Sequence, residues 1–408
     1  MNDMPIPDVT VVVGAYEAMP YLVRCLESVE AQTIGAHRIE IVAVDDGSTD
    51  GTGEYLEEFA ARSAVPTRVV RQANSGGPSG PRNVGLGMAR GRYVFFLDAD
   101  DYFGEEALER MVAMADRAGS DVVLGKVVGV NRGAPKSMWS ATRERVDVYN
   151  SKVIYTLSAQ KLFRRALLER LGLRFDEGLK TGEDALFTME AYLRGAGISV
   201  VSDYTCYYLV GRDDGKHVTK SGTYEWRFDS MRAMMQLIHR LEPAGPKRDF
   251  LMVRPFTVGM LQQFGPVFLR DSEEVRRHKL ELAAPLMDAY WDSGVAHLIK
   301  VAERLRLAAV ARGRSDVLVD MLTFVRDKSV PDVVRSRKGD KLFLAYPHFR
   351  DRSSGLLDAD FEVTVPDWHD GKRIERPAAA ARRASLSRRL ARRVRRDVRR
   401  WKSRIVAR

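Results

Sequence analysis

The chain has 408 residues, of which 45% are hydrophobic and 29% charged. This length and composition predict a globular protein of two or three domains and exclude a disordered chain. No apolar run reaches the length of a transmembrane helix, and the first residues lack the basic and apolar pattern of a secretory signal, so we expect a cytoplasmic protein.

The net charge of +10 is concentrated at one end of the chain. Residues 377–408 contain twelve arginines, Lys402 and a single acid, Asp397, which give +12, so the other 376 residues sum to −2. The two cysteines, Cys25 and Cys206, lie among apolar residues, and we predict that both are reduced thiols of the core.

The N-terminal part alternates short apolar runs with stretches of helical spacing. The runs predict strands at residues 8–13, 39–44, 67–71, 93–97 and 121–124, with a helix after each of the first four. This alternation predicts an α/β fold with a mostly parallel, Rossmann-like sheet and right-handed crossovers. The carboxyl ends of such strands line one crevice, where ligands bind.

Polar or glycine-rich residues follow each predicted strand. Tyr16 offers a ring for stacking, and Asp45 or Asp46 can accept a hydrogen bond from a base N–H. The glycines within residues 72–81 allow backbone amides to approach a ligand, and Arg82 adds a charge for a phosphate. Each residue also has a simpler interpretation: Asp46 belongs to a turn, Tyr16 covers the core, and Arg82 is a solvated helix residue. A site is therefore indicated by the occurrence of several such strand ends together, and not by any one of them.

Two groups of acids stand out. Asp98, Asp100 and Asp101 follow the buried strand at 93–97, and clustered carboxylates repel one another unless a divalent cation joins them. The alternative is an acidic loop that begins a helix. Glu183 and Asp184 lie at the start of a second helix, where the helix dipole alone would favour them; because helical neighbours point about 100° apart, at most one can face a substrate.

Together these motifs resemble the inverting family 2 glycosyltransferases of the GT-A fold. The motifs stand in the family's order and cover roughly residues 8–220: Val13–Glu17, Val44–Asp50, Asn74–Asn83, Asp98–Asp101, Lys161–Arg165 and Gly182–Phe187. Each is weak alone and the set is specific. Neither G-x-G-x-x-G nor G-x-x-x-x-G-K-[ST] is present, which disfavours dinucleotide oxidoreductases and P-loop NTPases.

The resemblance implies a nucleotide pocket for a UDP-sugar. By it, Gly14, Tyr16 and Asp46 hold uracil and ribose, with Glu17 of the same motif among the nucleotide-binding residues, and Asn74 and Arg82 line the pocket. One departure is Gly14, where relatives often carry proline or threonine. Another is Pro81, where alanine is usual, although proline suits the first turn of a helix.

The resemblance also implies the chemistry. Asp98 faces ribose and metal, Asp100 is the principal ligand of Mn²⁺ or Mg²⁺, and Asp184 is the general base with Glu183 beside it. In similar enzymes a segment after the catalytic helix closes over the diphosphate, which points to Arg212, His217 or Lys220. His217 is either a further metal ligand or a solvated loop histidine.

The rest of the first domain is less regular. Residues 126–157 are interpreted as a loop or hairpin over the crevice, 161–170 as a helix and 204–210 as a strand. Residues 224–328 show only helical spacing, with breaks near 243–246, 271–272, 292–294 and 313–315. In pattern, without shared motifs, this region resembles the helical segment of teichoic-acid-type glycosyltransferases. Strands are expected at 341–346 and 361–365.

The predicted domains are therefore a GT-A catalytic domain at 1–223, a helical domain at 224–329, a small β-rich appendage or linker at 330–376 and a basic amphipathic tail at 377–408. We interpret the appendage as a contact for the acceptor or for a second copy in a homo-oligomer. The apolar tail residues fall within an arc of about 120° on a helix: Leu386, Leu390, Val394, Val398, Trp401 and Ile405. This pattern favours binding to an anionic membrane surface over a nucleic-acid arm or a solvated tail.

We therefore expect a metal-dependent inverting glycosyltransferase, peripheral at the inner face of the plasma membrane. Its donor is a UDP-sugar, and its acceptor is a polymeric or lipid-linked glycan of the cell wall or surface, teichoic-acid-like or another polysaccharide. A nucleotidyltransferase is the nearest alternative enzyme, but residues 14–17 lack the cations that grip a triphosphate. A non-enzymatic nucleic-acid-binding protein would depend on the tail alone, so no nucleic-acid partner is expected.

Overall fold

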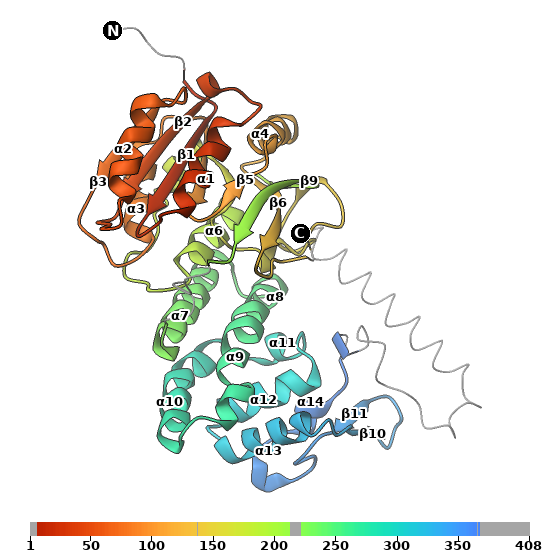
Figure 1. Ribbon diagram of the computed structural model, residues 1–408. Helices are drawn as coiled ribbons and strands as arrows, with labels where there is room; N and C mark the ends of the chain where they lie inside the picture. Colours follow the sequence, from red (N-terminus) through yellow and green to blue (C-terminus); the bar gives the residue numbers. More distant parts are fainter. Residues whose placement is uncertain (1–5, 137, 213–221, 365, 368–408) are drawn as a thin grey trace. The chain divides into compact units, whose positions relative to one another are not determined.

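The computed structural model describes residues 6–136, 138–212, 222–364, 366 and 367 (Figure 1). The chain divides into two compact units, Met1–Gly222 and Thr223–Arg408, and each is described by itself. None of the described helices is both long enough and apolar enough to cross a bilayer. Cys25 and Cys206 are free and buried, as predicted.

The first unit is built on a nine-stranded mixed sheet with the order β3-β2-β1-β4-β8-β6-β9-β5, in which β7 also pairs with β9. The strands are β1 (Val9–Ala15), β2 (Ile39–Asp45), β3 (Thr67–Arg71), β4 (Tyr93–Asp98), β5 (Tyr102–Phe103), β6 (Val122–Val130), β7 (Arg143–Val146), β8 (Leu162–Arg164) and β9 (Ile198–Val210). β3, β2, β1 and β4 are mutually parallel, and β6 is parallel to β9. The predicted α/β fold with a mostly parallel sheet is confirmed.

Helices cover both faces of this sheet. They are α1 (Tyr21–Glu30), α2 (Thr52–Arg62), α3 (Ser79–Met88), α4 (Ala107–Ala118), α5 (Arg165–Leu171) and α6 (Glu183–Arg194). Alternate β1 residues, such as Val11, point to one face, where they share a core with apolar residues of α1, α2 and α4. On the other face, the ring of Phe96 in β4 packs edge-on against Phe175 and Phe187, at centroid distances of 4.9 and 5.7 Å. This contact fixes the start of α6 against β4.

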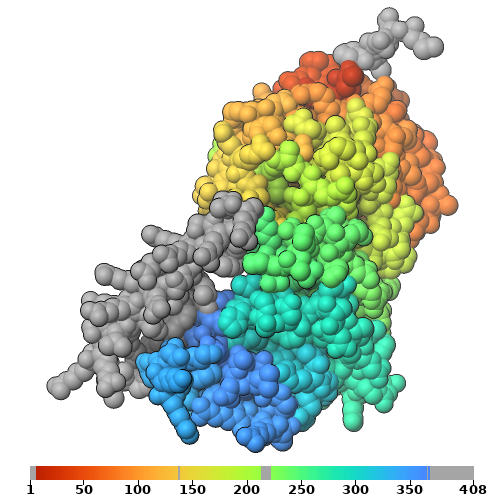
Figure 2. All heavy atoms as spheres, turned by 180° about the vertical axis from the view of Figure 1, so that it is seen from behind, coloured from red at the N-terminus to blue at the C-terminus, as the bar shows by residue number. Residues whose placement is uncertain are grey.

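Several expected elements differ from the structure. Residues 161–170 are not one helix, because Leu162 and Phe163 are buried as β8 between β4 and β6 before α5 begins. This pairing across the sheet outweighs the local helical spacing. Residues 126–157 were expected to form a loop or hairpin; instead β6 extends to Val130 and β7 follows, and in the described residues both strands pair with β9 and not with each other. On the face seen in Figure 2, the part of the chain from β6 to β9, coloured gold to yellow-green, forms much of the surface of the first unit.

The second unit is mainly helical, as predicted. Its helices are α7 (Tyr224–Leu241), α8 (Pro246–Arg254), the π-helical segment η4 (Pro255–Met260), α9 (Leu261–Gln263), α10 (Glu273–Tyr290), α11 (Ser293–Ala296), α12 (Val301–Ala311), α13 (Ser315–Arg326) and α14 (Asp358–Phe361). A two-stranded antiparallel sheet joins β10 (Asp332–Arg335) and β11 (Leu342–Ala345).

The predicted strand at 341–346 is confirmed as β11, whereas the strand expected at 361–365 is wrong. Residues 358–361 form α14, which begins where the Leu357 N–H donates to Asp360 Oδ2 at 2.8 Å. Among the described residues of 361–365, Glu362 alone forms a bridge, to Phe343. The local cap therefore outweighs the β-branched residues of the segment. The amphipathic helix expected at 377–408 lies outside the described residues.

A buried carboxylate fixes the amino ends of the central strands. Glu40 in β2 accepts hydrogen bonds from Thr10 Oγ1 at 2.6 Å, from the Arg90 N–H at 2.7 Å and from Arg68 Nη2 at 3.1 Å. Burial alone would raise the pKa of Glu40, but the bonds from Thr10 and Arg90 and the charge of Arg68 lower it. The ionised form is therefore the stabilising one.

We predict that Glu40→Gln lowers the free energy of unfolding by about 1–2 kcal/mol at pH 7, because hydrogen bonds to a charged group are lost while the two arginines stay partly solvated. Because folding lowers the pKa of Glu40, its contribution is present above about pH 4.3 and disappears as the pH falls through the lowered value. Urea denaturation at several pH values measures this, with the exposed Glu58→Gln as control. Equal losses in both variants would contradict the assignment.

Candidate active site

The strand order reverses beside β1, which pairs with β2 on one side and with β4 on the other. In register, Gly14 lies next to Asp98, and Ala15 lies next to Asp45. A crevice outside the carboxyl ends of strands forms at such a reversal. The polar ends of β1, β2 and β4 therefore meet at one edge of the sheet.

Arg82, in the first turn of α3, connects the two acidic groups. Its Nη2 donates to Asp98 Oδ1 at 2.7 Å and its Nη1 donates to Glu183 Oε1 at 3.1 Å, while only 8% of the residue is exposed. Burial opposes the charge, but Asp98 and Glu183 raise the pKa of Arg82 above its ordinary value. A fixed cation thus holds the end of β4 and the start of α6 together.

The three acids after β4 have different environments. Asp98 is also bound by Gln160, whose Nε2 donates to Oδ2 at 2.5 Å. Asp101 accepts from the Tyr207 hydroxyl at 2.6 Å and from the Val210 N–H at 2.7 Å, so it ties β9 to this edge. No described side chain donates a hydrogen bond to Asp100, and burial together with the charge of Asp98 raises its pKa to about 6.

These environments test whether the acids could hold a divalent cation. Asp100 fits, because its partly buried carboxylate has a charge that Arg212 and Arg132 offset only in part. Asp98 is partly occupied by Arg82 and Gln160. Among the described residues no group of three or more His, Cys, Asp or Glu is arranged to hold a metal. The chain therefore offers one or two carboxylates, the number that Mg²⁺ commonly takes alongside substrate phosphates.

Glu183 and Asp184, the two acids at the start of α6, have different partners. Gly182 has φ +82°, a conformation that favours glycine, and it turns the chain into α6 so that Glu183 and Asp184 occupy the first turn. Glu183 binds Arg82, whereas Asp184 Oδ1 accepts from the Ala185 N–H at 2.6 Å. Burial raises the pKa of Asp184, and Arg82 opposes this rise. Asp184 is the better candidate for a base, because Glu183 is committed to an ion pair.

The predicted nucleotide residues lie at the same edge. Tyr16 is 54% exposed at the end of β1, which leaves its ring open to stacking. Glu17 accepts from the Thr49 N–H at 2.8 Å. Asn74 is exposed, and its Oδ1 accepts from the Gly76 N–H at 2.8 Å.

Asp46 is 3% exposed and holds the glycine-rich loop in place. It accepts from Gln72 Nε2 at 2.6 Å and from the Ser75 hydroxyl at 2.9 Å. The carboxylate proposed to accept from a base N–H thus already has partners within the protein.

The two departures from the family pattern touch each other. A Cβ atom added at Gly14 would lie 3.2 Å from Cβ and 3.3 Å from Cγ of Pro81, tighter than most such contacts. The glycine thus makes room for the proline ring, and the proline fills space that a side chain at position 14 would take. This complementarity explains why both departures occur in one chain.

Of the three residues expected to close over the diphosphate, only Arg212 is described. Its Nη2 donates to the Glu17 carbonyl at 2.9 Å, and its guanidinium lies 5.0 Å from the centroid of the Tyr21 ring. It also lowers the pKa of Asp100, which places its charge near the acids after β4. His217 and Lys220 lie outside the described residues.

Sequence reasoning gave no individual role to several residues of the site, although Ser75 and Lys161 lie in two of the family motifs. Gln160, Ser75 and Tyr207 bind the acids of the strand ends, and Lys161 is buried beside β8. One feature of the sequence could have indicated two of them: the polar residues Gln160 and Lys161 stand directly before the apolar pair Leu162-Phe163, where the chain enters a buried strand. The helix expected at 161–170 obscured it.

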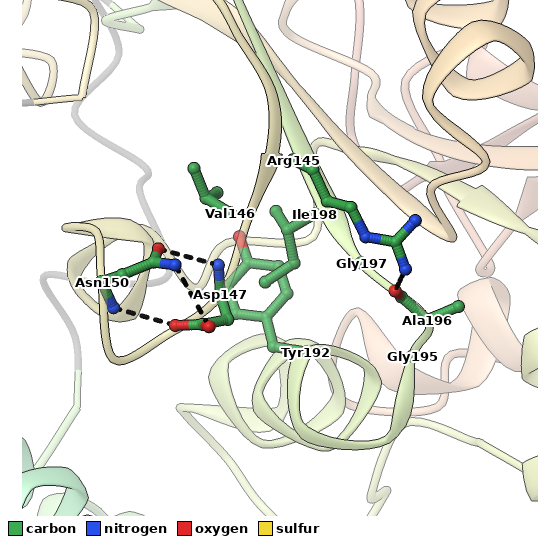
Figure 3. A pocket seen from close by; sticks show the side chains of 9 residues that line it. All are labelled: Arg145, Val146, Asp147, Asn150, Tyr192, Gly195, Ala196, Gly197 and Ile198. Carbon is green, nitrogen blue, oxygen red and sulfur yellow. Dashed lines mark hydrogen bonds between the residues drawn. The ribbon is translucent and has the colours of Figure 1, made fainter. Parts of the chain in front are cut away.

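A separate hollow of about 370 Å³ lies at the other end of α6 (Figure 3). Figure 3 shows Asp147 and Asn150 bonded to each other and Arg145 directed at the Ala196 carbonyl. The Tyr192 hydroxyl donates to the Thr156 carbonyl at 3.0 Å. Because these polar groups bind within the protein, the crevice at the strand ends remains the candidate site.

Two protein-family models match this chain. Residues 10–172 match the model described as Glycosyl transferase family 2, and residues 225–322 match the Glycosyl transferase TarS linker domain. The second match confirms the expected likeness of the helical region to teichoic-acid-type enzymes.

Two curated relatives are similar to about half of the chain. The chain is 41% identical over 212 residues to the poly(ribitol-phosphate) beta-glucosyltransferase of Bacillus spizizenii, covering 52% of this chain and 33% of the relative. It is 42% identical over 214 residues to the poly(ribitol-phosphate) beta-N-acetylglucosaminyltransferase TarS of Staphylococcus aureus, covering 52% and 37%. The match thus spans about a third of the length of these curated relatives.

A solved structure extends the likeness to both units. The crystal structure of S. aureus TarS 1-349 in complex with UDP-GlcNAc matches with a TM-score of 0.74 and 31% identity, covering 83% of this chain and 97% of that chain. With this identity and coverage, and with the match over residues 10–172, the chain belongs to glycosyl transferase family 2.

Proposed function

We propose that the protein transfers a sugar from a UDP-sugar to a hydroxyl group of a polyol-phosphate wall polymer or a related surface glycan. The observation that carries this proposal is that Arg82 forms two ion pairs, one with Asp98 and one with Glu183. These ion pairs bring the acids after β4, on the side of the diphosphate, into one crevice with the proposed base, Asp184. The names of the relatives indicate the polymer, and the UDP-GlcNAc in the TarS complex indicates the class of donor.

The chain's own residues suggest how the transfer proceeds. The Asp184 carboxylate accepts the proton of the acceptor hydroxyl while that oxygen attacks C1 of the sugar, and the bond from C1 to the UDP oxygen breaks with inversion. Tyr16 offers a stacking face for the uracil, and Arg212 places a positive charge near the leaving diphosphate. Arg82 keeps Asp98 and Glu183 in place throughout.

We predict that Asp184→Asn lowers kcat by about 10²- to 10⁴-fold, because an amide cannot accept the proton. Binding of UDP should change little. The assay is UDP release with UDP-glucose and UDP-GlcNAc in the presence of a polyol-phosphate polymer, with calorimetry for UDP binding. Glu190→Gln is a matched control, since Glu190 lies on the same helix and pairs with Arg194. Transfer at the wild-type rate by Asp184→Asn would remove the base assignment.

We also propose that Mn²⁺ or Mg²⁺ is the cofactor, held by Asp100 with help from Asp98. A bound divalent cation would offset the charge that develops on the diphosphate. The support is the poorly compensated charge of Asp100 beside Asp98.

Chelation by EDTA should therefore stop the transfer, and added Mn²⁺ or Mg²⁺ should restore it. Because a ligand carboxylate is lost, Asp100→Asn should raise the metal concentration for half-maximal activity by about tenfold or more. Metal titrations of UDP release measure both effects. Full activity in EDTA would rule out this role for the cation.

For residues 377–408 we propose a peripheral attachment to anionic lipid at the cytoplasmic side of the membrane. The support is the +12 charge and the apolar stripe of the tail sequence. A chain ending at residue 376 should lose binding to vesicles that contain phosphatidylglycerol, with no binding of either form to neutral vesicles. Sedimentation at two salt concentrations checks this, and equal binding by both chains would contradict it.

A further inference from the structure

A buried lysine lies close to the proposed base and has no role in the transfer as described above. Lys161 precedes β8 and is 2% exposed. Within the described residues its ammonium group donates to Ser158 alone, to the backbone carbonyl and to Oγ, the latter at 3.4 Å. An ammonium ion in the interior is costly unless an opposite charge lies near it.

The Ser158 carbonyl links this ammonium to the helix of the base. It also accepts from the Thr188 hydroxyl at 3.3 Å. Thr188 stands four residues after Asp184 on α6, so both side chains lie on one face of the helix, one turn apart. Lys161 therefore approaches the face of α6 that carries Asp184.

The charges around both groups agree with this placement. Burial lowers the pKa of Lys161 to about 7, and the charge of Asp184 opposes the fall. Four charged groups face Asp184: Arg82 from α3, Glu183 beside it, Asp98 from β4, and Lys161. Arg82 is the larger of the two positive influences, but its nitrogens are paired with Asp98 and Glu183. Among these four, Lys161 is the cation that has no carboxylate at ion-pair distance within the described residues.

We propose that Lys161 is a positioning residue for Asp184: its buried ammonium group keeps the carboxylate of the base ionised without touching either substrate. This inference rests on the proposed function, in which Asp184 accepts the proton. Without the ammonium, Asp184 would stay in a buried site beside two other acids, a setting that favours the neutral carboxylic acid. The neutral acid cannot accept the proton of the hydroxyl.

The test is the pH dependence of kcat/KM for sugar transfer by the full chain. For Lys161→Met, the acidic limb should move to higher pH by about one unit, because the positive charge that lowers the pKa of Asp184 is gone. Lys161→Arg keeps the charge and should keep the limb near its wild-type position. Lys152→Met, which removes an exposed lysine, is the control for loss of one charge. A merely structural role would lower the rate of Lys161→Met at every pH, with the limb unmoved, and that result would overturn the proposal.

A second measurement serves if Lys161→Met does not fold, as judged by loss of UDP binding. In protein labelled with ¹³C at lysine Cε, the Lys161 resonance, identified with Lys161→Arg, should titrate near neutral pH. In Asp184→Asn it should titrate at lower pH, because the neighbouring negative charge is removed. An unchanged titration would contradict the coupling. Failure of the proposed function can be distinguished from failure of this inference. In the first case the wild type would transfer no sugar, while the titration of Lys161 would still depend on Asp184.

Discussion

The architecture of the crevice depends on one buried guanidinium. Arg82 bridges Asp98 at the end of β4 and Glu183 at the start of α6, two residues that are 85 positions apart in the chain. Without a cation between them, these acids, Asp100 and Asp184 would repel one another in a partly buried site. Removing one partner of such a buried arrangement is expected to cost about 3–5 kcal/mol. The arrangement therefore holds together charges that the proposed transfer needs at close range.

Packing on both sides of the sheet places the three elements that Arg82 connects. The start of α3 comes close to β1 because Gly14 has no side chain and Pro81 occupies the space beside it. The start of α6 is held by Phe187, whose ring stacks on Phe175 at a centroid distance of 4.2 Å, and both rings pack on Phe96 of β4. Apolar packing sets the positions, and the ion pairs then fix the orientation of the acids.

Much of this could be predicted from the sequence, since the fold follows from local patterns. Buried runs such as residues 93–97 predict strands, and parallel strands predict that their carboxyl ends meet at one edge. The convergence of Asp98 and Asp184 was expected from family resemblance. The partners of each polar side chain were not, because they come from distant segments. Asp46 binds Ser75 of the glycine-rich loop, a pairing that no local pattern shows.

The errors have the same physical origin. Leu162–Arg164 is a three-residue strand whose stability comes from β4 and β6 on either side, so its own spacing predicted a helix instead. The burial and the contacts of Gln160 and Lys161 were not predicted for the same reason, although both residues lie close to charged groups of the site. Short strands and buried polar residues depend on tertiary contacts, which composition and periodicity do not record.

The most direct test of the account is a double-mutant cycle between Arg82→Met and Glu183→Gln, read as the free energy of unfolding. If the two side chains form a buried ion pair, their effects should depart from additivity by at least about 1 kcal/mol, because either single change leaves the same interaction broken. Effects that add to within about 0.5 kcal/mol would mean that the two residues do not interact, and the bridged crevice would then be wrong.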